Sequence, residues 1–238
     1  MKIALVLMLV LLTSVVFAEK VNVFECGFET GDGYSTGALT GQCGWTEYFN
    51  NTVNLYEVTE DVSYSGDQSL YVYGPRSGGD TGAKKTITYQ NPYQADTIFT
   101  YMLKPSAKYC RVYVYDSNDR EIIVIHINTH ELYVDAGGTW SGGDPNLSAD
   151  QWYQVTAVID PKKNIVKDFT LGEVRSIDGP RAYANGSASG DIGSLVIRTG
   201  WNDASDSYVD DISIDLVPEP ASIGLLALAG LFLLRKRS

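Results

Sequence analysis

Alternation of apolar and polar residues dominates the middle of the chain, and no long stretch shows the three-to-four-residue spacing of an amphipathic helix. The alternating segments are rich in β-branched and aromatic residues, and turn residues such as Asp-Ser-Asn-Asp at 116–119 separate them. The predicted strands include 70–73, 86–89, 97–103, 111–115, 121–128, 131–134, 152–159, 166–171, 195–198 and 208–216. The three between 111 and 134 follow one another closely enough to pair as antiparallel neighbours.

About eleven short strands at this spacing are typical of a sandwich or barrel. The stretch 137–150 holds four glycines and a proline, and we predict a loop there. We therefore expect an all-β fold, a two-sheet antiparallel jelly-roll sandwich, occupying residues 19–217. A single all-β domain can be this large and can bury its own core.

The N-terminal end has the pattern of a targeting segment. Residues 1–18 contain a lone Lys2, an apolar run and a final Val-Phe-Ala before Glu19, which predicts a cleavable signal peptide. An uncleaved membrane anchor is the alternative, although the apolar run is shorter than the ~20 residues that a spanning helix needs.

The C-terminal end, 218–238, has three parts. Pro218-Glu219-Pro220 is followed by the uncharged stretch 221–234 and by Arg-Lys-Arg-Ser. A helix over that stretch would be about 21 Å long, and flanking residues with a snorkelling Arg235 would let it span the membrane. We expect one short C-terminal transmembrane helix with its basic end in the cytoplasm.

This tail closely resembles the PEP-CTERM sorting signal, in Pro218, Glu219, Pro220, the apolar stretch and the basic end. The resemblance implies processing by an exosortase, a membrane-bound cysteine transpeptidase, in a Gram-negative bacterium with an exopolysaccharide locus. The expected location is the inner membrane through the C-terminus, and after processing the cell surface or the extracellular matrix.

The net charge of the middle of the chain restricts the kinds of ligand that it can bind. Four of the 18 basic residues and one of the 29 acidic residues lie in the two end segments, so the middle carries 14 basic against 28 acidic residues and a formal charge of −14. Such a surface repels phosphate backbones, so nucleic acid is not an expected partner. Cations or neutral polymers suit it better.

The middle contains three cysteines, so at most one disulfide can form within the chain. Export implies an oxidising compartment in which disulfides persist. The candidate pair is Cys26–Cys43, and Cys110 is expected to be a small apolar residue in a strand.

Three blocks of sequence resemble the concanavalin A-like jelly-roll superfamily, in particular its laminin-G-like and MAM-type modules and similar carbohydrate-binding modules. They are Glu-Cys-Gly-Phe-Glu at 25–29, Ser-Gly-Asp-Gln-Ser-Leu at 65–70, and Tyr-Val-Asp-Asp-Ile at 208–212. The resemblance implies that a strand near the start lies beside the last strand and that the Ser-Gly turn joins them. The spacing from Cys26 to Cys43 is MAM-like, but the remaining MAM cysteines are missing.

A structural Ca²⁺ could sit where these blocks meet. The candidate ligands are Glu29, Asp67 and Asp211, with backbone carbonyls of the Ser65-Gly66 turn, because Ca²⁺ takes six to eight such oxygens. The alternative is that these acids are solvated residues of turns and strand ends.

Sugar binding would need exposed aromatic side chains beside polar groups. Trp140, in the glycine-rich stretch, and Trp201, before Asn-Asp, are the candidates, whereas Trp45 and Trp152 are expected in the core. Core packing is the alternative for each of them.

Catalytic patterns were sought without success: the chain has no Glu-x-Asp-x-x-Glu strand of the laminarinase type, no Gly-x-Ser-x-Gly and no zinc-protease motif. The first hypothesis is therefore a non-enzymatic surface or matrix protein that binds glycan or a surface partner. It predicts two exposed aromatic residues on one face. A purely structural envelope protein and an atypical glycan-active enzyme, with two acids opposed across a cleft, are the alternatives.

Overall fold

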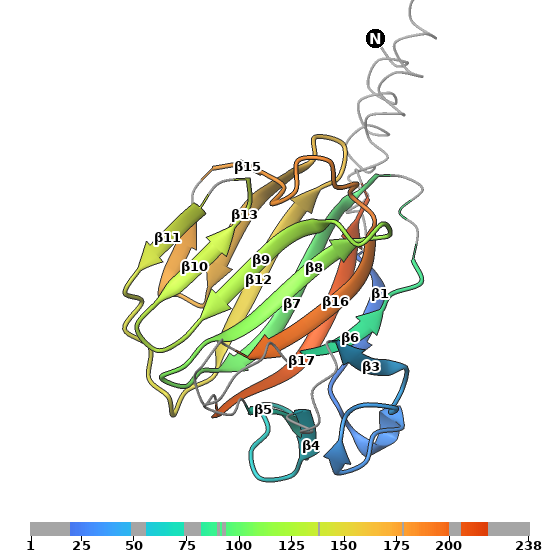
Figure 1. The fold of residues 1–238 in the computed structure, drawn as a ribbon, viewed down its shortest axis with the longest axis vertical. Helices are drawn as coiled ribbons and strands as arrows, with labels where there is room; N and C mark the ends of the chain where they lie inside the picture. Colours follow the sequence, from blue (N-terminus) through green and yellow to red (C-terminus); the bar gives the residue numbers. More distant parts are fainter. Residues whose placement is uncertain are drawn as a thin grey trace, which may run out of the picture.

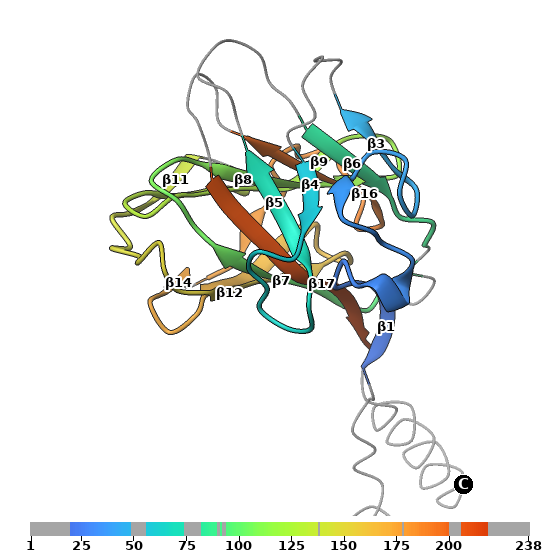
Figure 2. The same cartoon turned by 90° about the horizontal axis from the view of Figure 1, so that it is seen from below.

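The structure is a computed structural model of the chain, and it describes residues 20–48, 56–73, 82–89, 91, 94–137, 139–177, 179–199 and 206–218. These residues form two antiparallel sheets packed face to face (Figure 1). Figure 2 shows the layers apart, with β8, β9 and β16 in one and β7, β12 and β17 in the other. The all-β sandwich predicted from the alternation is confirmed. The predicted signal peptide and C-terminal helix lie outside the described residues.

The larger sheet forms one of the two layers of the sandwich. Its order is β14 (Arg175–Ile177), β13 (Ile165–Leu171), β12 (Tyr153–Asp160), β7 (Asp96–Lys104), β17 (Asp206–Val217), β5 (Ser69–Tyr73), β4 (Tyr56–Thr59) and β2 (Gly37–Ala38). Off this path, β1 (Val21–Cys26) pairs with β17, and β15 (Arg181–Ala182) pairs with β13. A short 3₁₀ helix, η1 (Thr30–Asp32), follows β1.

The smaller sheet has the order β11 (Thr139–Gly143), β10 (Leu132–Asp135), β9 (Glu121–Ile127), β8 (Cys110–Asp116), β16 (Ile192–Thr199), β6 (Gly82–Thr86) and β3 (Trp45–Tyr48). The three consecutive antiparallel strands predicted between 111 and 134 are β8, β9 and β10, and this prediction is confirmed. Two local predictions are wrong. The strand expected at 86–89 ends at Thr86, and the expected loop at 137–150 contains β11, which pairs with β10.

Alternation sets which side chains enter the core. In β5 the side chains of Leu70 and Val72 are fully buried between the sheets, so Tyr71 and Tyr73 point outward. Trp45 is buried as expected, and its indole N–H donates to the hydroxyl of Tyr34 at 3.0 Å. A core of this kind leaves two outer faces, one for each sheet, on which a ligand could bind.

Candidate functional site

The three sequence blocks that resemble jelly-roll modules come together in the structure. The first strand, β1, pairs with the last, β17, with Cys26 opposite Ile212. The Glu29 carboxylate accepts the backbone N–H groups of Asp67 at 3.2 Å and Gln68 at 3.1 Å. The implied meeting of the first strand, the Ser-Gly turn and the last strand is therefore confirmed.

Two consecutive aspartates of β17 fasten the loop 60–68 from its other side. Asp210 is 0% exposed, and its carboxylate accepts the backbone N–H groups of Tyr64 at 2.9 Å and Ser65 at 3.3 Å. The hydroxyl of Ser65 donates to Asp211 at 2.8 Å. A bulge in the pairing of β17 with β7 at this point gives Asp211 a φ of 45°, and it allows two neighbouring acids to serve the same loop.

Gly66 shows how closely the loop 60–68 packs against Glu29. Its φ is +58°, and a β-carbon there would lie 2.3 Å from Oε1 of Glu29. Only glycine fits, because any side chain would displace the carboxylate from the N–H groups that it accepts.

Two of the candidate calcium ligands, Glu29 and Asp211, contact the loop 60–68, and the third, Asp67, belongs to that loop. Both oxygens of Glu29 accept backbone N–H groups of the loop 60–68, and the side chain of Asp67 is exposed. In the part of the chain that the structure describes, no group of three or more His, Cys, Asp or Glu residues is placed to hold a metal ion. Calcium at Glu29, Asp67 and Asp211 stays a prediction. In the structure the Glu29 carboxylate holds the loop 60–68 by accepting its backbone N–H groups.

The disulfide predicted between Cys26 and Cys43 is absent, because both are free thiols here. Cys26 is buried and donates to the hydroxyl of Tyr34 at 3.1 Å, whereas Cys43 is exposed beside the carbonyl of Asp32. Burial raises the pKa of Cys26 to about 11. Cys110 is buried in β8, as expected, and burial raises its pKa to about 12. Unreactive, protonated thiols of this kind act as small apolar side chains.

The tryptophans proposed for sugar binding remain unplaced. The backbone of Trp140 lies in β11 opposite Val134, but its side chain and all of Trp201 lie outside the described residues. Trp152, expected in the core, is only half-buried, and its ring meets that of Tyr64 edge to face with centroids 5.9 Å apart.

Aromatic side chains instead form a row across the outer face of the larger sheet. Tyr71 of β5 is directly opposite Tyr208 of β17, which is opposite Lys104 of β7. Trp152 directly precedes β12, the next strand, whose Tyr153 pairs with Leu103. We call Tyr64, Tyr71, Tyr73, Trp152 and Tyr208 the aromatic row. It crosses three inter-strand steps, or about 14 Å.

The row is open to solvent and has polar neighbours. Tyr64 is 51% exposed and Tyr73 is 37% exposed. The rings of Tyr71 and Tyr208 lie 5.1 Å apart, and the ammonium of Lys104 lies 5.5 Å from the ring centre of Tyr208. Flat apolar surface beside groups that bind hydroxyls is the combination that sugars require.

Carboxylates also border the row. Asp206 accepts the hydroxyl of Tyr71 at 2.8 Å. Burial, followed by this hydrogen bond and the charge of Asp206, raises the pKa of Tyr71, and burial, followed by the charge of Asp61, raises that of Tyr208. Glu57 of β4 is opposite Tyr71 and exposed. Both tyrosines therefore remain neutral in a negative local potential.

The carboxylate of Asp210 has a raised pKa of the kind that a catalytic acid needs. Burial raises the pKa of Asp210 to about 6, against the hydrogen bonds from backbone N–H groups. The carboxylate is nevertheless enclosed, with no exposed surface, and its hydrogen bonds are to the backbone of 64, 65 and 211. It supports the loop that carries Tyr64 and lacks access to a substrate.

No family model and no curated protein matches this chain. Solved structures resemble it in fold. A carbohydrate esterase from a Shiga toxin-encoding bacteriophage has a TM-score of 0.58 at 10% identity, with 83% of this chain and 99% of the other covered. The globular domain of T. cruzi calreticulin has a TM-score of 0.52 at 11% identity, with 82% and 87% covered.

A sialidase also resembles the chain, with a TM-score of 0.52 at 12% identity. The match covers 72% of this chain and spans 17% of the sialidase. At such identities the likeness is one of fold, shared by proteins with different names and activities. The chain has the β-sandwich architecture of these proteins, and its function has to be argued from its own surface.

Proposed function

We propose that this protein is an exported, non-enzymatic surface or matrix protein that binds an uncharged glycan through the aromatic row. The observation that carries the proposal is the exposure of Tyr64 and Tyr73 on one face, in line with Tyr71, Tyr208 and Trp152. Ring faces would contact the C–H faces of sugar units, while Lys104 and Asp206 would bind hydroxyl groups. This is the surface that the first sequence hypothesis requires.

Charge favours a neutral glycan over an acidic one. Asp61, Asp206 and Glu57 lie around the row, and the body as a whole has a formal charge of −14. An anionic polysaccharide would meet a repulsive potential here. Carboxylates, by contrast, accept hydrogen bonds from neutral sugar hydroxyls.

Binding of the purified full chain to an array of neutral and acidic glycans tests this function. We expect neutral glycans to bind and Tyr208→Ala to weaken binding about tenfold, which corresponds to ~1.4 kcal/mol. Tyr133→Ala is the matched control, because Tyr133 is a half-buried tyrosine on the outer face of the other sheet. No binding to any neutral glycan, or equal losses in both variants, would contradict the proposal.

Sorting by an exosortase is part of the same proposal and rests on the tail motif Pro218-Glu219-Pro220. The last strand of the sandwich ends at Val217, so this motif follows the folded body directly. We expect Glu219→Ala to leave the protein in the inner membrane, whereas the unchanged chain reaches the surface or the matrix. Equal distribution of both in fractionated cells would count against sorting through this motif.

A further inference from the structure

A polar groove opens at the opposite end of the sandwich from the aromatic row. It lies between the turn that joins β12 to β13, the segment before β7 and the loop before β16, and its volume is about 420 Å³. Among the described residues that line it are Gln94, Asn164, Ser187, Ser189 and Asp191. The volume is within the range of small-ligand sites.

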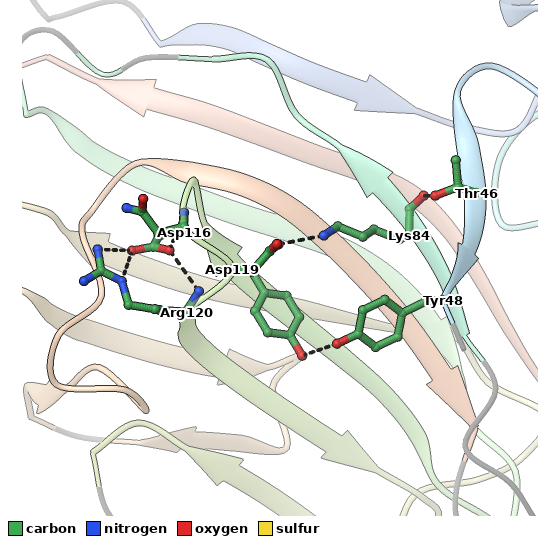
Figure 3. Close-up of polar contacts among 8 residues, drawn as sticks. Thr46, Tyr48, Lys84, Asp116, Asp119 and Arg120 are labelled. Atoms are coloured by element: carbon green, nitrogen blue, oxygen red, sulfur yellow. Dashed lines mark hydrogen bonds and ion pairs between the residues drawn. The ribbon is translucent and has the colours of Figure 1, made fainter. Parts of the chain in front are cut away.

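Contacts made by residues of the lining hold the walls of this groove in place. The N–H of Ser189 donates at 2.8 Å to the buried carboxylate of Asp116. The same carboxylate pairs with Arg120 at 2.8 Å (Figure 3). Gly190 packs so closely on Pro161 that a β-carbon would lie 1.9 Å from the proline ring. These contacts hold the loop before β16 against the turn after β12.

Hydrogen bonds also hold the third wall, the segment before β7. The side-chain amide of Asn91 donates to the carbonyl of Ala95 at 2.7 Å and accepts its N–H at 2.9 Å. The backbone N–H of Asn91 donates to Asp191 at 3.3 Å. A site held by three independent anchors is pre-organised, so binding costs little ordering of the protein.

Near the groove, two hydroxyl oxygens are enclosed by the protein and have no hydrogen-bond partner among the described residues. They are the side-chain oxygens of Ser189, in the lining, and of Tyr89. Tyr89 lies near Asp191, since the charge of Asp191, after burial, raises the pKa of Tyr89. Buried hydroxyls are nearly always bonded, and rotation of the Ser189 side chain toward the groove would let its hydroxyl bond a polar ligand there.

We propose that this groove is a second binding site, which takes a single uncharged, hydroxyl-rich unit such as a sugar residue. Its described lining offers amide, hydroxyl and carboxylate groups but no aromatic ring, so recognition is by hydrogen bonds and not by stacking. Lys162 and Asp191 contribute opposite charges, which leaves the lining without a strong preference for a charged ligand.

The groove is distinct from the aromatic row and does not depend on it. The strand β7 begins at Asp96, beside the groove, and ends at Lys104, within the row. Nine residues of strand separate the two sites by about 26 Å. Ligand binding at one site can therefore be measured without interference from the other.

Titration of the ¹⁵N-labelled full chain with glucose, mannose, galactose and N-acetylglucosamine tests the proposal. We expect at least one sugar to shift the amide signals of Ser189, Gly190 and Asp191 in a saturable way. Ser187→Trp, which fills the groove, should weaken that response about tenfold. Ser35→Trp is the control, because Ser35 is an exposed serine on a loop near η1.

Other outcomes separate this proposal from the function of the row. If no sugar shifts these amides, or if Ser187→Trp leaves the response unchanged while the spectrum stays that of a folded protein, the groove is not a sugar site. Should Ser187→Trp unfold the chain, Asp191→Asn serves instead, since asparagine can still accept the N–H of Asn91. Tyr208→Ala should leave the sugar-induced shifts of the groove amides unchanged. Failure of the proposal for the aromatic row can therefore be distinguished from failure of the proposal for the groove.

Discussion

The two outer faces of the sandwich both carry tyrosines, but they use them differently. On the larger sheet Tyr64 and Tyr73 are 51% and 37% exposed. On the smaller sheet Tyr113 and Tyr115 are only 7% and 6% exposed, and Val196 beside them is completely buried. The smaller sheet thus has a second apolar cluster on its outside, whereas the larger one has ring surface left over for a ligand.

The contacts of the rings explain this difference. On the smaller sheet the guanidinium of Arg198 lies 4.9 Å from the ring centre of Tyr113 and 5.7 Å from that of Tyr48. Tyr113 and Tyr115 are stacked with centroids 5.9 Å apart. Figure 3 shows the rim of this face, with Tyr48 beside the ion pair of Lys84 and Asp119. A count of aromatic residues therefore does not identify a binding face, because what matters is ring surface that the protein itself does not cover.

Replacing a tyrosine by alanine should affect stability very differently on the two faces. We expect Tyr113→Ala to cost about 4 kcal/mol of unfolding free energy, because it removes a buried ring and one support of Arg198. Tyr73→Ala should cost about 0.5 kcal/mol or less, because that ring is 37% exposed. Urea unfolding of both variants gives the comparison, and equal losses would show that the row, too, is structural.

The pH dependence of stability tests the support under the row. The folded pKa of Asp210, about 6, lies above the ordinary value of 3.8. The folded state therefore binds this proton more tightly than the unfolded state. Its stabilising effect is complete below pH 3.8 and is lost as pH rises through about 6, a change of about 3 kcal/mol.

Asp210→Asn removes that titration, and the difference in unfolding free energy between the natural chain and this variant should change over the interval from pH 4 to 6. A difference that is constant with pH would mean that Asp210 is ionised in both states. Binding of neutral glycans by the variant shows in addition whether Asp210 positions Tyr64, whose backbone it holds.

The strands were predictable because alternation records burial directly. In β5, Leu70 and Val72 are buried and Tyr71 is not, so the same pattern already marked Tyr71 as outward-facing. What sequence cannot show is register: the alignment of Tyr71 with Tyr208, 137 positions further on, arises only from strand pairing. The sequence marks tryptophans in glycine-rich segments as candidates for sugar binding, but it does not single out tyrosines in regular strands.

The errors have comparable causes. The sequence Thr-Trp-Ser-Gly-Gly of β11 predicts a loop, yet the pairing of β11 with β10 uses backbone groups that any residue supplies. The role of Asp210 is not predicted, because a bulge, which alternation does not reveal, turns its side chain beneath the loop 60–68. Cysteine spacing suggested a disulfide, although Tyr34 lies at the thiol of Cys26.

A smaller effect is expected from Arg198→Lys. Lysine keeps the charge but loses the planar group that lies against Tyr48 and Tyr113, so we expect a loss of about 1 kcal/mol. Lys104→Arg is the corresponding change on the larger sheet, and it should leave stability unchanged to within about 0.5 kcal/mol. Thermal unfolding of both variants measures the difference. If Arg198→Lys is neutral, the guanidinium does not cover the rings of the smaller sheet.

The smallest effect concerns calcium and the loop that carries Tyr64. We expect the melting temperature of the purified full chain to be the same with a chelator and with added Ca²⁺, because the described residues contain no group of three or more His, Cys, Asp or Glu placed to hold a metal ion, and Glu29 fastens the loop by accepting the N–H groups of Asp67 and Gln68. Glu29→Gln should lower it under both conditions, since an amide accepts these hydrogen bonds at only one of its two terminal atoms. A chelator that lowers the melting temperature of the natural chain but not of Glu29→Gln would instead place a cation at this carboxylate. The loop would then be fastened to the larger sheet by a metal, and exposure of Tyr64 on the row would depend on calcium.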